Sequence, residues 1–154
     1  MAEGVFKELV KQKGLENVIQ CDSAGTGVYH KGILPDKRMQ EIAMKNGFAL
    51  THTSRQLSGR DFVKYNYILA MDESNFDYIR AESFNANGHY MSEDQLHLYR
   101  MFDPQRGDSR IIEDPSYYKE ISVFEEVYEI VKRSGINFLD FLTEKHNLTV
   151  QTNL

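Results

Sequence analysis

Apolar residues recur at helical spacing in three parts of the chain, and each part is predicted to be an amphipathic helix. These helices are expected at residues 1–12, 35–46 and 124–142. Gly135 lies inside the last one and weakens its middle, because glycine loses more backbone entropy than other residues when it becomes helical. The residues after about His146 lack the pattern and are expected to form a loose tail.

Three short apolar runs predict β-strands, at residues 18–21, 65–71 and 96–102. The second of them, YNYILAM, is the best candidate for a buried strand. A further helix is expected over residues 72–81, whereas the polar residues 82–95 are too many for an ordinary connection and predict a surface excursion. Strands that alternate with helices indicate an α/β fold, in which helices cover both faces of a parallel sheet.

Length and charge indicate one globular domain, over residues 1–146, followed by the tail at residues 147–154. Eighteen basic and 23 acidic residues give a net charge of −5, which counts against general binding to nucleic acid or to anionic membranes. The chain contains no apolar run of the roughly 20 residues that a membrane span needs, and its start does not read as a secretory signal. The single cysteine, Cys21, cannot form an internal disulfide, so a cytoplasmic location is expected.

Other catalytic motifs are missing from the sequence. The five histidines form no pair at metal-binding spacing and no cluster with cysteine, so no metal site is expected. Neither of the glycine-rich motifs that bind nucleotide phosphates is present. The sequence therefore implies no cofactor.

Four segments, in order, resemble the low-molecular-weight protein-tyrosine phosphatases: VIQCDSAGTGVYHKGILPD, LTHTSRQ, DFVKYNYILAMDESN and IIEDPSYY. The resemblance runs from Met1 to about Leu142. It implies a flavodoxin-like fold and the hydrolysis of phosphotyrosine, in proteins or as an aryl phosphate, without a metal. In similar enzymes a cysteine in a C-x5-R-S loop attacks phosphorus, and the cysteinyl-phosphate intermediate is then hydrolysed.

The resemblance also assigns roles to an aspartate and to three tyrosines. Asp114 matches the general acid that protonates the departing tyrosine oxygen, although an Asp-Pro dipeptide is also ordinary turn chemistry. Tyr29, Tyr117 and Tyr118 match aromatic residues that flank the substrate ring. Ser116 separates the last two from the Asp-Pro dipeptide, unlike the common family pattern, and Tyr29 could equally be a packing residue.

Three further residues are expected to support the phosphate loop and not to be catalytic. Ser23, His52 and Asp72 match groups that brace this loop in similar enzymes. Asp72 also has a simpler role as the cap of a predicted helix. A single histidine near a turn is more often a structural residue than a catalyst.

The nucleophile loop itself is absent from the sequence. A C-x5-R loop requires arginine six positions after cysteine, but the position six after Cys21 is Gly27, and Cys21 is better explained as a small buried side chain. Residues 1–6 match the residues that follow the loop in similar proteins. We therefore expect an amino-terminally truncated, inactive chain that lacks the first strand, which in this fold lies between the second and third. A non-catalytic module that binds a partner through its tyrosines is the alternative.

Overall fold

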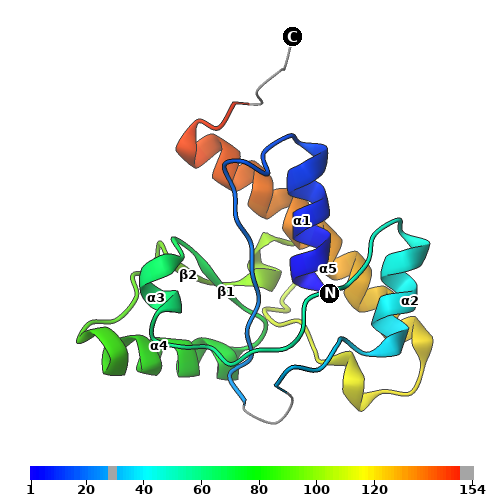
Figure 1. Cartoon of the computed structure of the whole chain (residues 1–154), viewed down its shortest axis with the longest axis horizontal. Coiled ribbons are helices and arrows are strands. Elements are labelled where there is room, and N and C mark those ends of the chain that lie inside the picture. The colour runs from blue at the N-terminus through cyan, green and yellow to red at the C-terminus, as the bar shows by residue number, and fades with distance from the viewer. Residues whose placement is uncertain (28–30, 150–154) are drawn as a thin grey trace.

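The protein, described here by a computed structural model over residues 1–27 and 31–149, combines a bundle of helices with a small parallel sheet (Figure 1). Three of the predicted helices are confirmed. They are α1 (Ala2–Gln12), α2 (Lys37–Lys45) and α5 (Ile121–His146). The apolar side of α1 packs against α5, where the rings of Phe6 and Phe138 lie 5.4 Å apart. None of the helices in the described residues is long and apolar enough to cross a membrane.

The sheet consists, within the described residues, of the parallel strands β1 (Ile68–Ala70) and β2 (Leu96–Leu98). Both lie inside runs that the sequence predicts as strands. The short helix α3 (Asp61–Lys64) precedes β1, and α4 (Glu73–Asn87) connects the two strands. A crossover through a helix is the usual connection between parallel strands.

Helices cover both faces of the sheet, as predicted, and the residues of β1 and its flanks alternate between two hydrophobic clusters. Tyr67, Leu69 and Met71 pack against the cluster that contains α1 and α5. Ile68 and Ala70 belong to the second cluster, which includes residues of α3 and α4. The period of two that defines a strand thus sends neighbouring side chains into separate cores.

Two predictions about local structure are wrong. Residues 18–21 do not form a strand: they run from a turn into an extended segment that has no strand beside it in the described part of the chain. Of residues 96–102, only the first three are a strand, and Tyr99–Phe102 forms the short 3-10 helix η1. Apolar composition predicts burial, but a strand also needs a hydrogen-bonded neighbour.

The predicted surface excursion over residues 82–95 is also wrong in its first part. Helix α4 continues to Asn87 and ends at Gly88, whose φ of 75° is the left-handed conformation that closes many helices. The prediction failed because this part of the helix is polar, with Ser83 as its one buried residue beyond Ile79.

Gly135 does not interrupt α5 but allows a close approach of other elements. A Cβ atom at this position would lie 2.8 Å from the hydroxyl oxygen of Tyr99 and 2.9 Å from Cδ1 of Leu9. The missing side chain therefore lets α1 and η1 reach the α5 backbone, and tertiary packing offsets the low helix propensity of glycine. At the end of α5, Asn147 adopts a left-handed conformation and Leu148 packs against the core.

Candidate functional site

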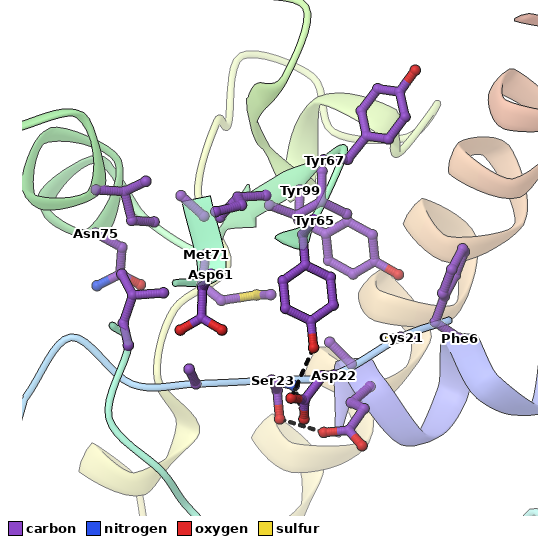
Figure 2. Close-up of a pocket in the computed structure, with 18 of the residues that line it drawn as sticks. Phe6, Cys21, Asp22, Ser23, Asp61, Tyr65, Tyr67, Met71, Asn75 and Tyr99 are labelled. Carbon is purple, nitrogen blue, oxygen red and sulfur yellow. Dashed lines mark hydrogen bonds between the residues drawn. The ribbon is translucent and has the colours of Figure 1, made fainter. Parts of the chain in front are cut away.

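A cavity of about 950 Å³ lies between the extended residues 18–25 and strand β1 (Figure 2). Its apolar walls come from both sides of the gap, with Phe6, Ile19 and Cys21 on one side and Leu69 and Met71 on the other. Polar side chains gather at one end of the cavity. Met71 and Asn75, which follow β1, also line the cavity, and the carboxyl ends of parallel strands are where α/β proteins commonly bind ligands, so the cavity is the candidate site.

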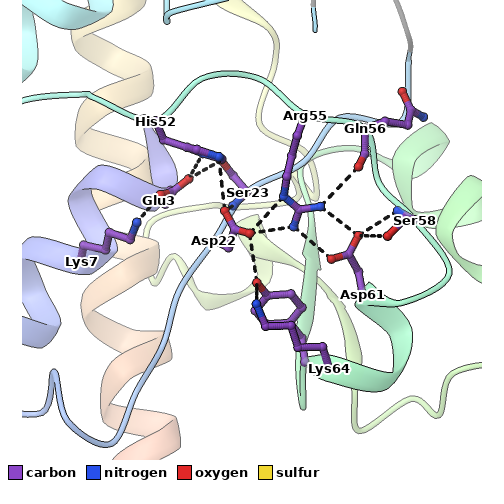
Figure 3. Close-up of polar contacts among 11 residues, drawn as sticks. Glu3, Lys7, Asp22, Ser23, His52, Arg55, Gln56, Ser58, Asp61 and Lys64 are labelled. Atoms are coloured by element: carbon purple, nitrogen blue, oxygen red, sulfur yellow. Dashed lines mark hydrogen bonds and ion pairs between the residues drawn. The ribbon is translucent and has the colours of Figure 1, made fainter. Parts of the chain in front are cut away.

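Glu3 accepts hydrogen bonds at the centre of one polar cluster (Figure 3). It is almost fully buried and is contacted by Lys7, by the hydroxyl of Ser23 and by Nδ1 of His52, the last at 2.5 Å. Burial alone would raise the pKa of Glu3, but the hydrogen bonds from Lys7 and Ser23 outweigh it and bring the pKa below its usual value. Glu3 is therefore a fixed negative charge on the first turn of α1.

Arg55 joins two further carboxylates beside this cluster. Its guanidinium donates to both oxygens of Asp61 at 3.0 Å and to Asp22, and Asp22 also accepts from the hydroxyl of Tyr65 at 3.0 Å. Burial would raise the pKa values of Asp22 and Asp61, but these hydrogen bonds lower both. The pKa of Arg55 is raised, chiefly by the hydrogen bonds to Asp61. The result is an ion-paired arginine with a bidentate carboxylate partner.

Asp114 lines the cavity, unlike the two tyrosines that follow it. Its carboxylate accepts from the N–H of Ser116 at 2.9 Å and caps the 3-10 helix η2 (Pro115–Tyr117). Tyr117 is 85% exposed, and the hydroxyl of Tyr118 donates to Glu113 at 2.8 Å. The structure thus brings Asp114 to the cavity and directs the tyrosines elsewhere.

The three residues expected to support a phosphate loop do not form one group. Ser23 and His52 are in contact, with 3.1 Å between Oγ and Nδ1, and both contact Glu3. Asp72 instead caps α4 by accepting from the N–H of Asn75 at 2.7 Å. Tyr29, the remaining residue of the predicted site, lies outside the described residues.

Cys21 lines the cavity as a half-buried thiol. Burial raises its pKa to about 12, and the negative charge of Glu3 adds to this effect. A thiol nucleophile requires a lowered pKa, so the environment of Cys21 is the opposite of a reactive one.

One group of side chains has the composition of a metal site. Glu3, Asp22 and His52 each offer a ligand atom, and these atoms lie within 4.8 Å of one another. The carboxylates, however, already accept hydrogen bonds from lysine, arginine, serine and tyrosine side chains. A metal ion would have to displace these donors, so the residues present fit a hydrogen-bonded cluster better than a cation site.

Sequence reasoning missed most of this polar network. Glu3 was given no role in the site, although its spacing from Lys7 is that of a helical ion pair. Arg55 and Asp61 lie in two of the quoted segments, LTHTSRQ and DFVKYNYILAMDESN, but neither residue was assigned a role. A signal was available for Asp22, which directly follows an apolar run, because polar residues at such positions collect at the ligand-binding edge of α/β folds.

Comparisons with known proteins agree on one family. A family model described as "Low molecular weight phosphotyrosine protein phosphatase" matches residues 1–148. A protein of the same name from Gallus gallus is 38% identical over 140 residues, which are 91% of this chain and 85% of that protein.

Solved structures agree with this assignment. The crystal structure of YfkJ from Bacillus subtilis superposes with a TM-score of 0.80 at 30% sequence identity, over 94% of this chain and 86% of that chain. A Drosophila arginine phosphatase also has a TM-score of 0.80, at 27% identity, over 91% of this chain and 87% of the other. The fold is therefore the flavodoxin-like α/β fold that these structures share.

Proposed function

Because the chain belongs to the low molecular weight phosphotyrosine protein phosphatase family, we propose that its chemistry is that of phosphotyrosine hydrolysis, with Asp114 as the general acid. The observation that carries the proposal is the family match over residues 1–148 together with the position of Asp114 on the cavity wall. An exposed carboxyl group at the rim of a cavity can meet the oxygen of a departing phenolate. Protein phosphotyrosine or another aryl phosphate is the proposed substrate class.

We propose as well that this chain does not turn over substrate by itself. Hydrolysis through a cysteinyl-phosphate needs a low-pKa thiol and an arginine that binds the equatorial phosphate oxygens. The sole thiol has a pKa raised to about 12, and Arg55 is already bound to Asp22 and Asp61. Residues 1–154 therefore contain the proposed acid but neither of the other two groups.

An assay with p-nitrophenyl phosphate tests both statements. The purified chain, the Asp114→Asn variant and the control Asp108→Asn, an exposed aspartate outside the cavity, are all expected to match the buffer blank. Turnover that Asp114→Asn abolishes and Asp108→Asn retains would establish Asp114 and overturn inactivity. Turnover that Asp114→Asn leaves unchanged would overturn the role of Asp114. Phosphoarginine belongs in the same assay, because a Drosophila arginine phosphatase shares the fold.

A non-catalytic binding module is the second candidate, and the 85% exposure of Tyr117 favours it. Exposed aromatic residues are common anchors at protein interfaces. In this case folded, inactive protein binds a phosphotyrosine peptide saturably, and Tyr117→Ala weakens binding at least tenfold. The control is Tyr90→Ala, because Tyr90 is also exposed (54%) but stacks on Phe84 of α4, a different element. An equal loss of peptide affinity in both variants would show that Tyr117 has no specific role in binding.

A further inference from the structure

The loop that carries Asp114, here called the acid loop (residues 113–120), has little hydrophobic packing to hold it. It contains no buried side chain: Pro115 is half-buried and the others are exposed. The nearest buried side chains are Ile112 before the loop and Phe124 after it. A segment with so few buried apolar contacts moves easily relative to its core unless polar contacts attach it.

The hydrogen bonds inside the acid loop shape it but do not attach it to the rest of the protein. Asp114 accepts from the N–H of Ser116 at 2.9 Å. The hydroxyl of Tyr118 donates to Glu113 at 2.8 Å, and its N–H donates to the carbonyl of Pro115 at 3.0 Å. These bonds join residues of one turn to one another, so they leave the turn free to move as a unit.

The acid loop is attached at its two ends. Before it, the buried Ile112 donates its N–H to the carbonyl of Met71, directly after β1, at 2.8 Å. Near its other end, Nη1 of Arg38 donates to the carbonyl of Tyr118 at 2.9 Å. Within the described residues, this is the one hydrogen bond that reaches residues 113–120 from a distant part of the chain.

The guanidinium of Arg38 is itself held on its other sides. Nε and Nη2 donate to the two oxygens of Asp36, at 3.0 and 2.7 Å. Its central carbon lies 3.9 Å from the ring centre of Phe124, a fully buried residue of α5. A guanidinium that forms a bidentate pair and stacks on an aromatic ring has little freedom to rotate. Arg38 therefore presents Nη1 to the acid loop in a fixed direction.

Asp36 connects this arrangement to the rest of the fold. Its carboxylate also accepts from the N–H of Arg38 at 2.8 Å and so caps α2. Helix α2 packs beside the first part of α5 (Figure 1). The contacts of Arg38 thus join the start of α2, the start of α5 and the acid loop.

We propose that Arg38 is a positioning residue, which holds the acid loop through the carbonyl of Tyr118 and so keeps Asp114 at the cavity. Arg38 does not line the cavity itself. Its role rests on the proposed function of Asp114, because a general acid must lie within hydrogen-bond reach of the oxygen that it protonates. Loss of the Arg38 contact displaces the acid without changing it.

Amide hydrogen exchange, measured by NMR on the whole chain, tests the attachment. In Arg38→Ala the amides of Ser116 and Tyr118 should exchange at least tenfold faster, because their turn is no longer held. The amide of Gln40, which donates to Asp36 at 3.0 Å in the first turn of α2, should be unchanged. The control Arg110→Ala removes the same charge from an arginine whose pair with Glu73, at 3.7 Å, is exposed, and it should alter none of these rates.

A pH titration tests the position of Asp114 directly. Because the Ser116 amide donates to the Asp114 carboxylate, its chemical shift should follow the ionisation of that group. The size of this pH-dependent change should fall at least twofold in Arg38→Ala, since the bond forms in fewer molecules. A contact that only stabilised the fold would leave this titration unchanged in folded protein.

Asp36→Asn provides a second route if Arg38→Ala does not fold. Asparagine keeps an oxygen that can cap α2 but loses the charge that pairs with the guanidinium. Exchange at Ser116 should become at least threefold faster, with the amide of Gln40 again unchanged. Circular dichroism establishes that each variant is folded.

Three results would overturn the proposal. Unchanged exchange and titration at Ser116 in Arg38→Ala would show that the acid loop keeps its place without this bond. An equal effect of Arg110→Ala would reduce the result to the loss of one positive charge. Loss of protection in α2 together with the loop would give Arg38 a general structural role. Failure of the acid role of Asp114 is separate, because it is measured by hydrolysis and leaves these loop measurements as they are.

Discussion

Nδ1 of His52 lies 2.5 Å from Oε2 of Glu3, so two residues that are 49 positions apart in the chain share one hydrogen bond. The contact links the first turn of α1 to the loop that precedes α3, and Ser23 joins both partners. These side-chain contacts thereby connect α1, the extended segment around Ser23 and the loop that carries His52. The stability of this end of the molecule should depend on the ionised state of its carboxylates.

The pH dependence of stability follows from these carboxylates. The pKa of Glu3, like those of Asp22, Asp61 and Asp103, is lower in the folded chain than its usual value. A group with a depressed folded pKa stabilises the fold above its unfolded pKa, and this contribution is lost as the pH falls through the folded value. The free energy of unfolding in urea should therefore fall steeply below about pH 4.

Replacing Glu3 isolates its share of this effect. Glu3→Gln should lower the free energy of unfolding at pH 7 by about 2 kcal/mol, because Lys7, Ser23 and His52 lose a charged acceptor. The variant and the unmodified chain should converge in stability as the pH approaches 3. A difference that is constant with pH would contradict an electrostatic origin.

The ion pair between Asp103 and Arg133 should stabilise the fold. Asp103 is fully buried and accepts two hydrogen bonds from the guanidinium, at 2.9 and 3.0 Å. Asp103→Asn should lower the free energy of unfolding by about 3 kcal/mol, since it leaves a positive charge without its partner. The control is Asp140, which lies on an exposed part of α5, the helix that also carries Arg133. Its carboxylate pairs with Lys13 at 3.8 Å. Its replacement by asparagine should cost less than about 1 kcal/mol, and equal losses would disprove the argument.

Gly135→Ala should destabilise the protein even though alanine is the better helix former. The propensity gain of about 1 kcal/mol is outweighed by the overlap of the new methyl group with Tyr99 and Leu9, which costs typically 1–3 kcal/mol. We expect a net loss of about 1 kcal/mol in urea unfolding. Glu129→Ala, on the exposed side of α5, should be nearly neutral. A stabilised Gly135→Ala variant would show that α1 and η1 can move away from α5.

Cys21 should react slowly with thiol reagents. With a pKa of about 12, its thiolate fraction at pH 8 is on the order of a thousandfold lower than that of an unperturbed cysteine. The labelling rate should still rise above pH 10 and should increase sharply when urea unfolds the chain. A rate that levels off near pH 8.5 in the folded protein would contradict the raised pKa.

The sequence predicted what depends on periodicity and on local caps. The amphipathic patterns of residues 1–12 and 35–46 located α1 and α2, and alternating strands and helices indicated the α/β class. The strand predicted at residues 18–21 is wrong, because an apolar run does not show whether another strand lies beside it. The second half of α4 was not predicted as helix, because it has almost no buried face and so no apolar pattern.

The candidate site was less predictable than the fold. Asp114 could be singled out because it belongs to a recognisable motif, and the structure brings it to the cavity. The contacts of Arg55 with Asp22 and Asp61 join residues 33 and 6 positions apart, and no spacing rule relates such partners. Contacts of this kind are a product of the chain's three-dimensional path and become visible only in the structure.

The alternation of side chains along β1 has a consequence for how the molecule comes apart. Leu69 belongs to one hydrophobic cluster, while Ile68 and Ala70 belong to the other. Strand β2 alternates in the same way, because Leu96 and Leu98 lie in the second cluster and His97 stacks on Tyr67 at the first. Cooperative unfolding units communicate through the residues they share. The shared element is the pair β1–β2, so we expect a local opening of either core to stop at these two strands.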